Sequence, residues 1–219
     1  GLVGSEMCIR DSLYIVHYQD DGQYDVVIVD CAPTGETLRL LSFPEVLHWW
    51  MTKMFPVGRK LATVAHPLAR ALINMPFPEA EVFDSVEELY SELDKIRALL
   101  TDAEKASVRL VVNPEKMVIK ETQRTFTYLN LYGYTTDLIV CNRLLPPGLD
   151  GHYFDSWREA QERHYQLIEE SFAPVPILNV PFFAQEVIGI EMLELMADAL
   201  FGTQDPSQVF FHGQAQRIE

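Results

Sequence analysis

The chain has 219 residues, of which 48% are hydrophobic and 22% charged, a balance typical of globular rather than disordered proteins. Its formal net charge is −15, with 17 basic residues against 32 acidic ones. Because binding to a nucleic-acid backbone needs clustered Lys and Arg, this charge argues against a nucleic-acid partner. The apolar runs are far shorter than the roughly 20 residues that span a bilayer, so we expect a chain that does not itself cross a membrane.

The beginning of the chain differs in character from the rest. Residues 1–12 show no apolar periodicity and do not continue into any predicted helix or strand, so we set them aside as a non-native-looking leader. We expect the folded domain to occupy residues 13–202 and residues 203–219 to form a C-terminal tail or linker. Three scattered cysteines, Cys8, Cys31 and Cys141, form no CxxC pair, which indicates a reducing, cytoplasmic compartment and no protein-bound zinc.

Short apolar runs along the chain predict four strands, at residues 25–30 (DVVIVD), 108–113 (VRLVVN), 138–142 (LIVCN) and 176–180 (PILNV). Each run is nearly continuous in hydrophobicity, as is typical of strands buried on both faces of a parallel sheet. Helical patterns lie between them, and this alternation predicts an α/β fold with a doubly wound, mostly parallel sheet. Ligands in such folds bind beyond the carboxyl ends of the strands, so we expect function directly after each run.

Helices are predicted at residues 119–132, 155–172 and 185–201, the second with Asp155 or Ser156 as its N-cap. The segment at about 44–107 is too long for an ordinary crossover between strands. It contains successive apolar stripes at helical spacing, interrupted by prolines. We therefore expect a helical subdomain inserted into the sheet domain.

Residues 25–44 (DVVIVDCAPTGETLRLLSFP) carry the strongest functional signal. Magnesium-nucleotide enzymes place a carboxylate at the end of a hydrophobic strand, near the metal and usually through a coordinated water, and Asp30 takes that position. The turn that follows can present backbone N–H groups, a hydroxyl and a glycine to an anion. A bare VVIVD run is more often followed by simple helix capping, but the full DCAPTGETLRLL string is much more specific.

This string closely resembles the switch II segment of the ArsA-type ATPases, the arsenite-pump and tail-anchored-protein-targeting branch of the P-loop proteins, with its pattern D-T-A-P-T-G-x-T-L-R-x-L. Three further stretches resemble segments of the same family in the same order: residues 111–124 (VVNPEKMVIKETQR), 140–146 (VCNRLLP) and 180–186 (VPFFAQE). The resemblance covers roughly residues 24–201.

The resemblance implies an enzyme that hydrolyses ATP, with ATP and Mg²⁺ as cofactors. It implies that the catalytic residues are Asp30, which also holds Mg²⁺ through a water, Thr34 and Gly35. It implies that the nucleotide is bound by Pro33, Glu121, Asn142, Arg143, Pro181 and Phe182. An amide at Asn142 can donate to and accept from one edge of an adenine ring. A lone Asn after a strand is more often a turn or cap residue, but four matches in one order favour the adenine interpretation.

The sequence also departs from the family pattern. None of its 219 residues forms a GxxxxGK[ST] phosphate loop, and no switch I segment is present. Since phosphoryl transfer depends on these parts to position and stabilise charge, we expect a fragment that does not hydrolyse ATP by itself. Cys31 stands where the family usually has Thr, and without clustered cysteines we expect no stimulation by arsenite.

The family places its client-binding or regulatory surface in the helical insert, and it implies a homodimer. Several large apolar residues of the insert would suit a groove for a hydrophobic-helix client or a membrane partner protein: Trp49, Trp50, Met51, Met54 and Phe55. Packing within the subdomain's own core is the alternative. Two other functions stay open, a partition-type ATPase and a nucleotide-independent, chaperone-like holdase.

Overall fold

The computed structural model describes residues 22, 24–31, 53, 90, 91, 93–148 and 152–213. The chain divides into two compact units, Gly1–Leu100 and Thr101–Glu219, and most of the described residues belong to the second. No helix among them is long and apolar enough to cross a membrane.

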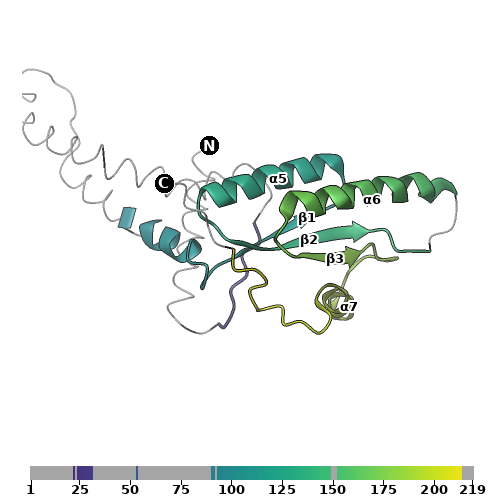
Figure 1. Ribbon diagram of the computed structural model, residues 1–219. Coiled ribbons are helices and arrows are strands. Elements are labelled where there is room, and N and C mark those ends of the chain that lie inside the picture. Colours follow the sequence, from purple (N-terminus) through teal and green to yellow (C-terminus); the bar gives the residue numbers. More distant parts are fainter. Residues whose placement is uncertain are drawn as a thin grey trace, which may run out of the picture. The chain divides into compact units, whose positions relative to one another are not determined.

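The second unit is built on a sheet of three parallel strands in the order β1, β2, β3 (Figure 1). Strand β1 spans Val108–Val112, β2 spans Thr136–Leu144 and β3 spans Ile177–Pro181. These strands coincide with three of the four apolar runs, and their parallel pairing confirms the predicted sheet type.

Three helices cover the sheet, and Figure 1 shows α5 and α6 on one face and α7 on the other. Helix α5 (Lys116–Leu131) connects β1 to β2, α6 (His152–Phe172) connects β2 to β3, and α7 (Ile190–Phe201) follows β3. An α/β fold with helices on both faces of a parallel sheet was predicted, and the structure confirms it.

Strand β2 is buried on both faces, which explains its continuous apolar sequence. Ile139 and Cys141 belong to the core cluster that α5 and α6 cover, whereas Leu138 and Val140 belong to the cluster against which α7 packs. Since successive side chains of a strand point to opposite faces, a strand between two helix layers needs an apolar residue at every position. Burying each such side chain contributes about 1.5–3 kcal/mol.

Three predicted helix starts are wrong. Helix α5 begins at Lys116 rather than at residue 119. Helix α6 begins at His152, so Asp155 and Ser156 are not its N-cap. Asp155 instead lies in the first turn, where an acid interacts favourably with the helix dipole, and its carboxylate is 2.9 Å from the guanidinium of Arg158. Helix α7 begins at Ile190 rather than at residue 185, because Gly189 has a φ of +83°, which a right-handed helix does not accommodate.

In the first unit, residues 24–31 have no regular secondary structure. Ile28 is 88% exposed, and the neighbouring valines at 26, 27 and 29 are also exposed. The prediction of a buried strand at residues 25–30 is therefore wrong for this structure. A strand is defined by hydrogen bonds to a neighbouring strand, and an apolar run does not specify that neighbour.

Only part of the predicted helical insert lies among the described residues. Residues 93–100 are helical, and Leu93 and Ile96 on this segment are buried, as the apolar stripes of the insert predict. The aromatic and methionine cluster at 49–51 and 54–55 lies outside the described residues.

The stretch after α7 packs against the amino ends of β1 and β2. Arg109 donates hydrogen bonds of 2.8 Å to the carbonyl oxygens of Pro206 and Gln208. Phe210 joins the core cluster on the α7 face and Phe211 packs against the cluster on the other face. Figure 1 shows this segment, drawn in yellow, running back from α7 toward the amino ends of the strands. Residues 205–211 therefore close the sheet at the end opposite to its carboxyl edge.

Candidate functional site

The carboxyl ends of β2 and β3 lie side by side, and their pairing is irregular at one point. Cys141 pairs with Asn179 and Leu144 pairs with Pro181, so Asn142 and Arg143 on β2 together face Val180 on β3. This is a β-bulge, an extra residue that bends a strand and redirects its side chains, and bulges are over-represented beside active sites. The bulge occurs at the two residues of this strand that the family resemblance assigns to nucleotide binding.

The backbone at the bulge has an uncommon conformation. Arg143 has a φ of +59°, in the left-handed region that residues with a Cβ rarely adopt. The Oδ1 atom of Asn142 accepts a hydrogen bond of 2.9 Å from the N–H of Arg143, which holds this conformation in place. Because the amide oxygen has a second lone pair and the Nδ2 atom is a donor, Asn142 retains both functions needed to bind an adenine edge.

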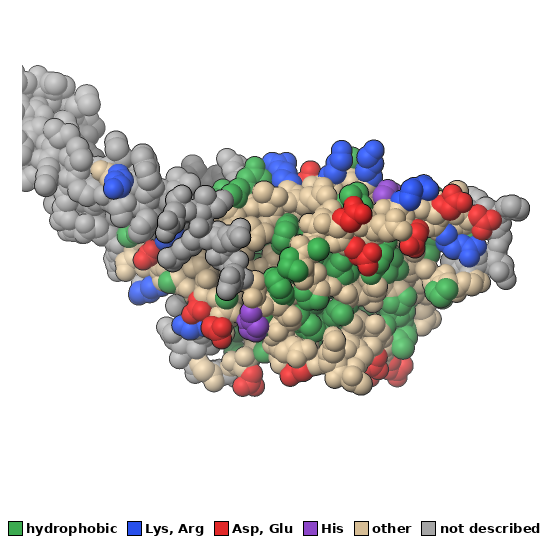
Figure 2. All heavy atoms as spheres, in the orientation of Figure 1, with side chains coloured by type: hydrophobic (Ala, Val, Ile, Leu, Met, Phe, Trp, Pro, Cys, Tyr) green, Lys and Arg blue, Asp and Glu red, His purple; other side chains and the backbone are tan. Residues whose placement is uncertain are grey.

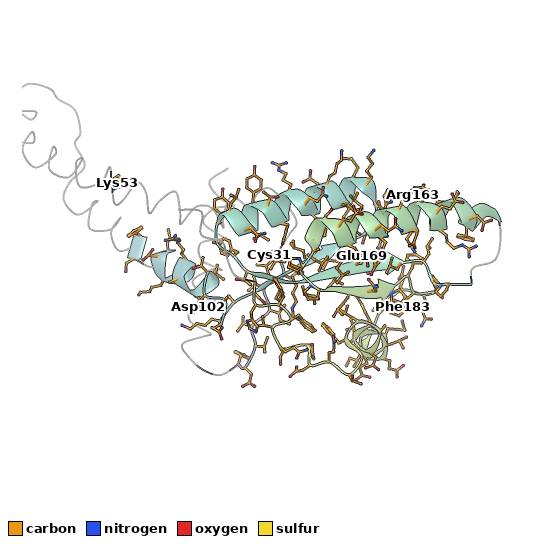
Figure 3. The ribbon with its side chains drawn as sticks, in the orientation of Figure 1. Cys31, Lys53, Asp102, Arg163, Glu169 and Phe183 are labelled. Carbon is orange, nitrogen blue, oxygen red and sulfur yellow. The ribbon has the colours of Figure 1, made fainter. Side chains whose placement is uncertain are left out.

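The loop after β3 is tied to the end of β2. The N–H of Phe182 donates a hydrogen bond of 2.7 Å to the carbonyl oxygen of Leu144. Phe183, labelled in Figure 3, is partly buried against the cluster under α7. Phe182 is 52% exposed. An exposed ring at this edge offers a flat surface on which a nucleobase can stack.

The two loops after β1 and β2 are each bound by a side chain of α6. The Nδ1 atom of His164 lies 2.8 Å from the carbonyl oxygen of Pro114, and the Oε1 atom of Gln161 accepts a 2.8 Å hydrogen bond from the N–H of Leu145. Neither residue was predicted from the sequence. One sequence feature could have indicated them. The two polar residues are spaced i and i+3, on the same helix face as the buried Ile168 and Phe172.

Ionisable groups at this edge differ in exposure. Arg143 is exposed, and Glu121 is exposed on the second turn of α5. Cys141, next to Asn142, is buried, and burial raises the pKa of its thiol to about 11. Cys141 is therefore a packing residue, whereas Arg143 presents a positive charge that suits an anionic ligand. Figure 2 shows side chains of both charge signs along α5 and α6, and hydrophobic side chains between that helix layer and α7.

The remaining residues implied by the resemblance lie in the first unit or outside the described residues. Asp30 is exposed and belongs to the first unit. Pro33, Thr34 and Gly35 lie outside the described residues. Within the described ranges no three His, Cys, Asp or Glu side chains gather into a metal-binding group.

A parallel sheet with helices on both faces and a bulged, polar carboxyl edge defines an α/β protein of the doubly wound type. The model of the anion-transporting ATPase family matches residues 8–202, and the chain belongs to this family, the ArsA family. The resemblance drawn from the sequence motifs is thereby confirmed.

Individual relatives agree with this membership. The putative arsenical pump-driving ATPase of Prosthecochloris vibrioformis is 40% identical over 224 residues, which cover 96% of this chain and 55% of the relative. The putative arsenical pump-driving ATPase 1 of Aquifex aeolicus is 35% identical, covering 96% of this chain and 54% of the relative. The ATPase get3 of Pyrenophora tritici-repentis is 30% identical, covering 84% and 56% respectively. The chain thus spans little more than half the length of these relatives.

Proposed function

We propose that this chain supplies the base-binding edge and the phosphate-sensing segment of an ATPase that binds and hydrolyses ATP. The observation that carries the proposal is the bulge at Asn142 and Arg143, which together face Val180, next to Pro181, at the carboxyl edge of the sheet. In doubly wound folds this edge is where ligands bind. The relatives' names, all of which contain the word ATPase, point to the same chemistry.

Binding of the base follows from the groups at this edge. The amide of Asn142 can pair with an adenine edge as donor and acceptor, and the exposed ring of Phe182 can stack on the base. The hydrogen bond from Phe182 to Leu144 fixes the distance between the two loops before any ligand arrives. Pro181 stiffens the end of β3, and Arg143 adds a cation that favours a charged ligand.

In the same proposal, the segment that contains Asp30 binds the phosphates of the nucleotide. In this proposal the Asp30 carboxylate holds Mg²⁺ through a water, and Mg²⁺ supplies charge stabilisation to the phosphates. The turn with Pro33, Thr34 and Gly35 faces the terminal phosphate and responds to its loss. Glu121 completes the nucleotide-binding set. Because the chain contains no GxxxxGK[ST] loop, we expect ATP hydrolysis from the whole protein and not from this chain alone.

The coupling of nucleotide state to the helical insert is part of the same proposal. The insert binds a hydrophobic-helix client or a membrane partner protein, and the whole protein acts as a homodimer in the cytoplasm. The names of the relatives, arsenical pump-driving ATPase and get3, suggest two kinds of partner without deciding between them.

A binding titration tests the nucleotide part directly. We expect saturable binding of an ATP analogue that carries a fluorescent methylanthraniloyl group on its ribose, in the presence of Mg²⁺. Asn142→Ala should weaken this binding by about tenfold, since a bidentate contact to a base is worth about 1–3 kcal/mol. Asn130→Ala, on the exposed surface near the C-terminus of α5, is the matched control and should bind as the parent does. No binding at millimolar nucleotide would instead favour the nucleotide-independent holdase.

A further inference from the structure

One face of α6 makes hydrogen bonds to the backbone of the loops that follow β1 and β2 and to a side chain of β3. Gln161, His164 and Tyr165 are spaced i, i+3 and i+4, so they lie on the same side of the helix. We propose that this face, which we term the α6 brace, holds the nucleotide-binding loops in position and thereby sets nucleotide affinity. The second part of this inference rests on the proposed function.

The first two contacts reach the loops that follow β1 and β2. The carbonyl oxygen of Pro114 can only accept, so the Nδ1 atom of His164, 2.8 Å away, carries the hydrogen and donates it. Gln161 works in the opposite sense, since its Oε1 atom accepts from the N–H of Leu145. One helix thus satisfies a backbone acceptor in one loop and a backbone donor in the next.

The other contacts extend the brace to β3. The Nδ2 atom of Asn179 donates a 3.0 Å hydrogen bond to the hydroxyl oxygen of Tyr165. The N–H of Phe182 donates to Leu144, the residue directly before Leu145. A continuous set of contacts therefore runs from the loop after β1, through α6 and the end of β2, to the loop after β3.

The helix that provides these contacts is anchored in the core. Ile168 and Phe172, the next residues along the same face, have no exposed surface and pack with Ile139 and Cys141 of β2. The N–H of Leu145 lies just beyond the end of β2, where the ladder to β3 no longer provides a regular partner. Without Gln161 this donor would depend on water, and the loop that carries Asn142 and Arg143 would have more conformations to lose when a nucleotide binds.

The test combines amide hydrogen exchange with nucleotide titration on the 219-residue chain. Gln161→Leu removes the acceptor at nearly constant volume, whereas Gln161→Glu keeps an oxygen at the same position. Gln166→Leu is the matched control: it makes the same substitution on the same helix, at an exposed residue whose side chain donates to Glu162 rather than contacting a loop. His164→Leu and His164→Asn form a second pair, because Asn can donate where the imidazole does.

We expect about tenfold faster exchange of the Leu145 and Phe182 amides in Gln161→Leu, with the amide of Ile139 in the core unchanged. Gln161→Glu and Gln166→Leu should exchange within about twofold of the parent chain, since neither removes the acceptor of the Leu145 N–H. His164→Leu should weaken binding of the fluorescent ATP analogue by about fivefold, and His164→Asn should restore most of it.

Unchanged exchange at Leu145 in Gln161→Leu would overturn the brace itself. Faster exchange there with unchanged nucleotide affinity in both leucine variants would overturn the link from the brace to binding. A parent chain that shows normal protection at Leu145 but binds no nucleotide would overturn the proposed function, and with it that link, while the exchange data would still support the brace as a structural feature.

Discussion

The guanidinium group of Arg109 lies 3.5 Å from the carboxylate of Asp137, a side chain with no exposed surface. Asp137 has no counterpart on β1, because the register shifts between Val108 and Arg109. The same guanidinium donates to two carbonyl oxygens of the stretch after α7. One cation therefore neutralises a buried charge and fixes the chain at the amino end of the sheet.

Replacing Arg109 by Met should lower the free energy of unfolding by about 3 kcal/mol, because it leaves the Asp137 carboxylate buried without its cation. Urea denaturation followed by circular dichroism measures the change. The double variant Arg109→Met/Asp137→Leu removes the buried charge as well and should recover much of the loss. A single variant as stable as the parent would show that Asp137 is not charged or not buried in the folded chain.

Cys141 should resist alkylation in the folded chain. Its thiol is buried and its pKa is raised to about 11, so iodoacetamide at pH 8 finds almost no thiolate there. Cys31 is exposed and should be modified first. Mass spectrometry of the digested protein measures both sites, and unfolding in urea before alkylation is the control that should make Cys141 reactive.

The raised pKa of Cys141 also has a consequence for stability. Between the ordinary thiol pKa and about 11, the unfolded chain loses a proton that the folded chain keeps, so stability falls as the pH rises through this window. Cys141→Ser would add a polar hydroxyl to the core and so change stability for a second reason. Cys141→Ala removes the titrating group without adding a polar one. In the alanine variant the decrease in stability between pH 9 and about 11 should be smaller than in the parent chain.

Asp30→Asn should remove most of the effect of Mg²⁺ on nucleotide affinity, because an amide does not provide the negative charge that holds the hydrated ion. Titration of the fluorescent ATP analogue with Mg²⁺ and with EDTA measures this difference. Asp25→Asn, at the start of the same exposed segment, is the matched control and should keep the full Mg²⁺ effect. Equal Mg²⁺ dependence in the Asp30 variant and the parent chain would remove Asp30 from the metal site.

The core of the second unit was predictable from the sequence because its signals are local. Strands β1, β2 and β3 follow from apolar runs, and α5 and α6 follow from apolar residues at helical spacing. The exposed segment with Val26 to Val29 has an equally apolar sequence, yet it forms no strand, because strand formation depends on a partner elsewhere. The start of α7 was misplaced since the positive φ of Gly189 is set by the loop that precedes the helix.

The candidate site was predictable in part. Asn142 and Phe182 could be identified by the family resemblance, and the structure brings their loops together through Leu144. The bulge at Asn142 could not be foreseen, because it depends on the register between β2 and β3. Gln161 and His164 were missed since nothing in a polar residue on a helix says which loop the helix will approach.

The most direct test of the nucleotide site is a titration of the isotopically labelled chain with ATP and Mg²⁺, followed by backbone NMR. Nucleotide binding at the carboxyl edge predicts that the amide signals of Asn142, Arg143 and Phe182 shift together and saturate at one nucleotide concentration, while that of Arg109 at the opposite end of the sheet does not move. Saturating shifts at Arg109 and its neighbours without any at Asn142 and Phe182, or no shifts at millimolar ATP, would contradict it.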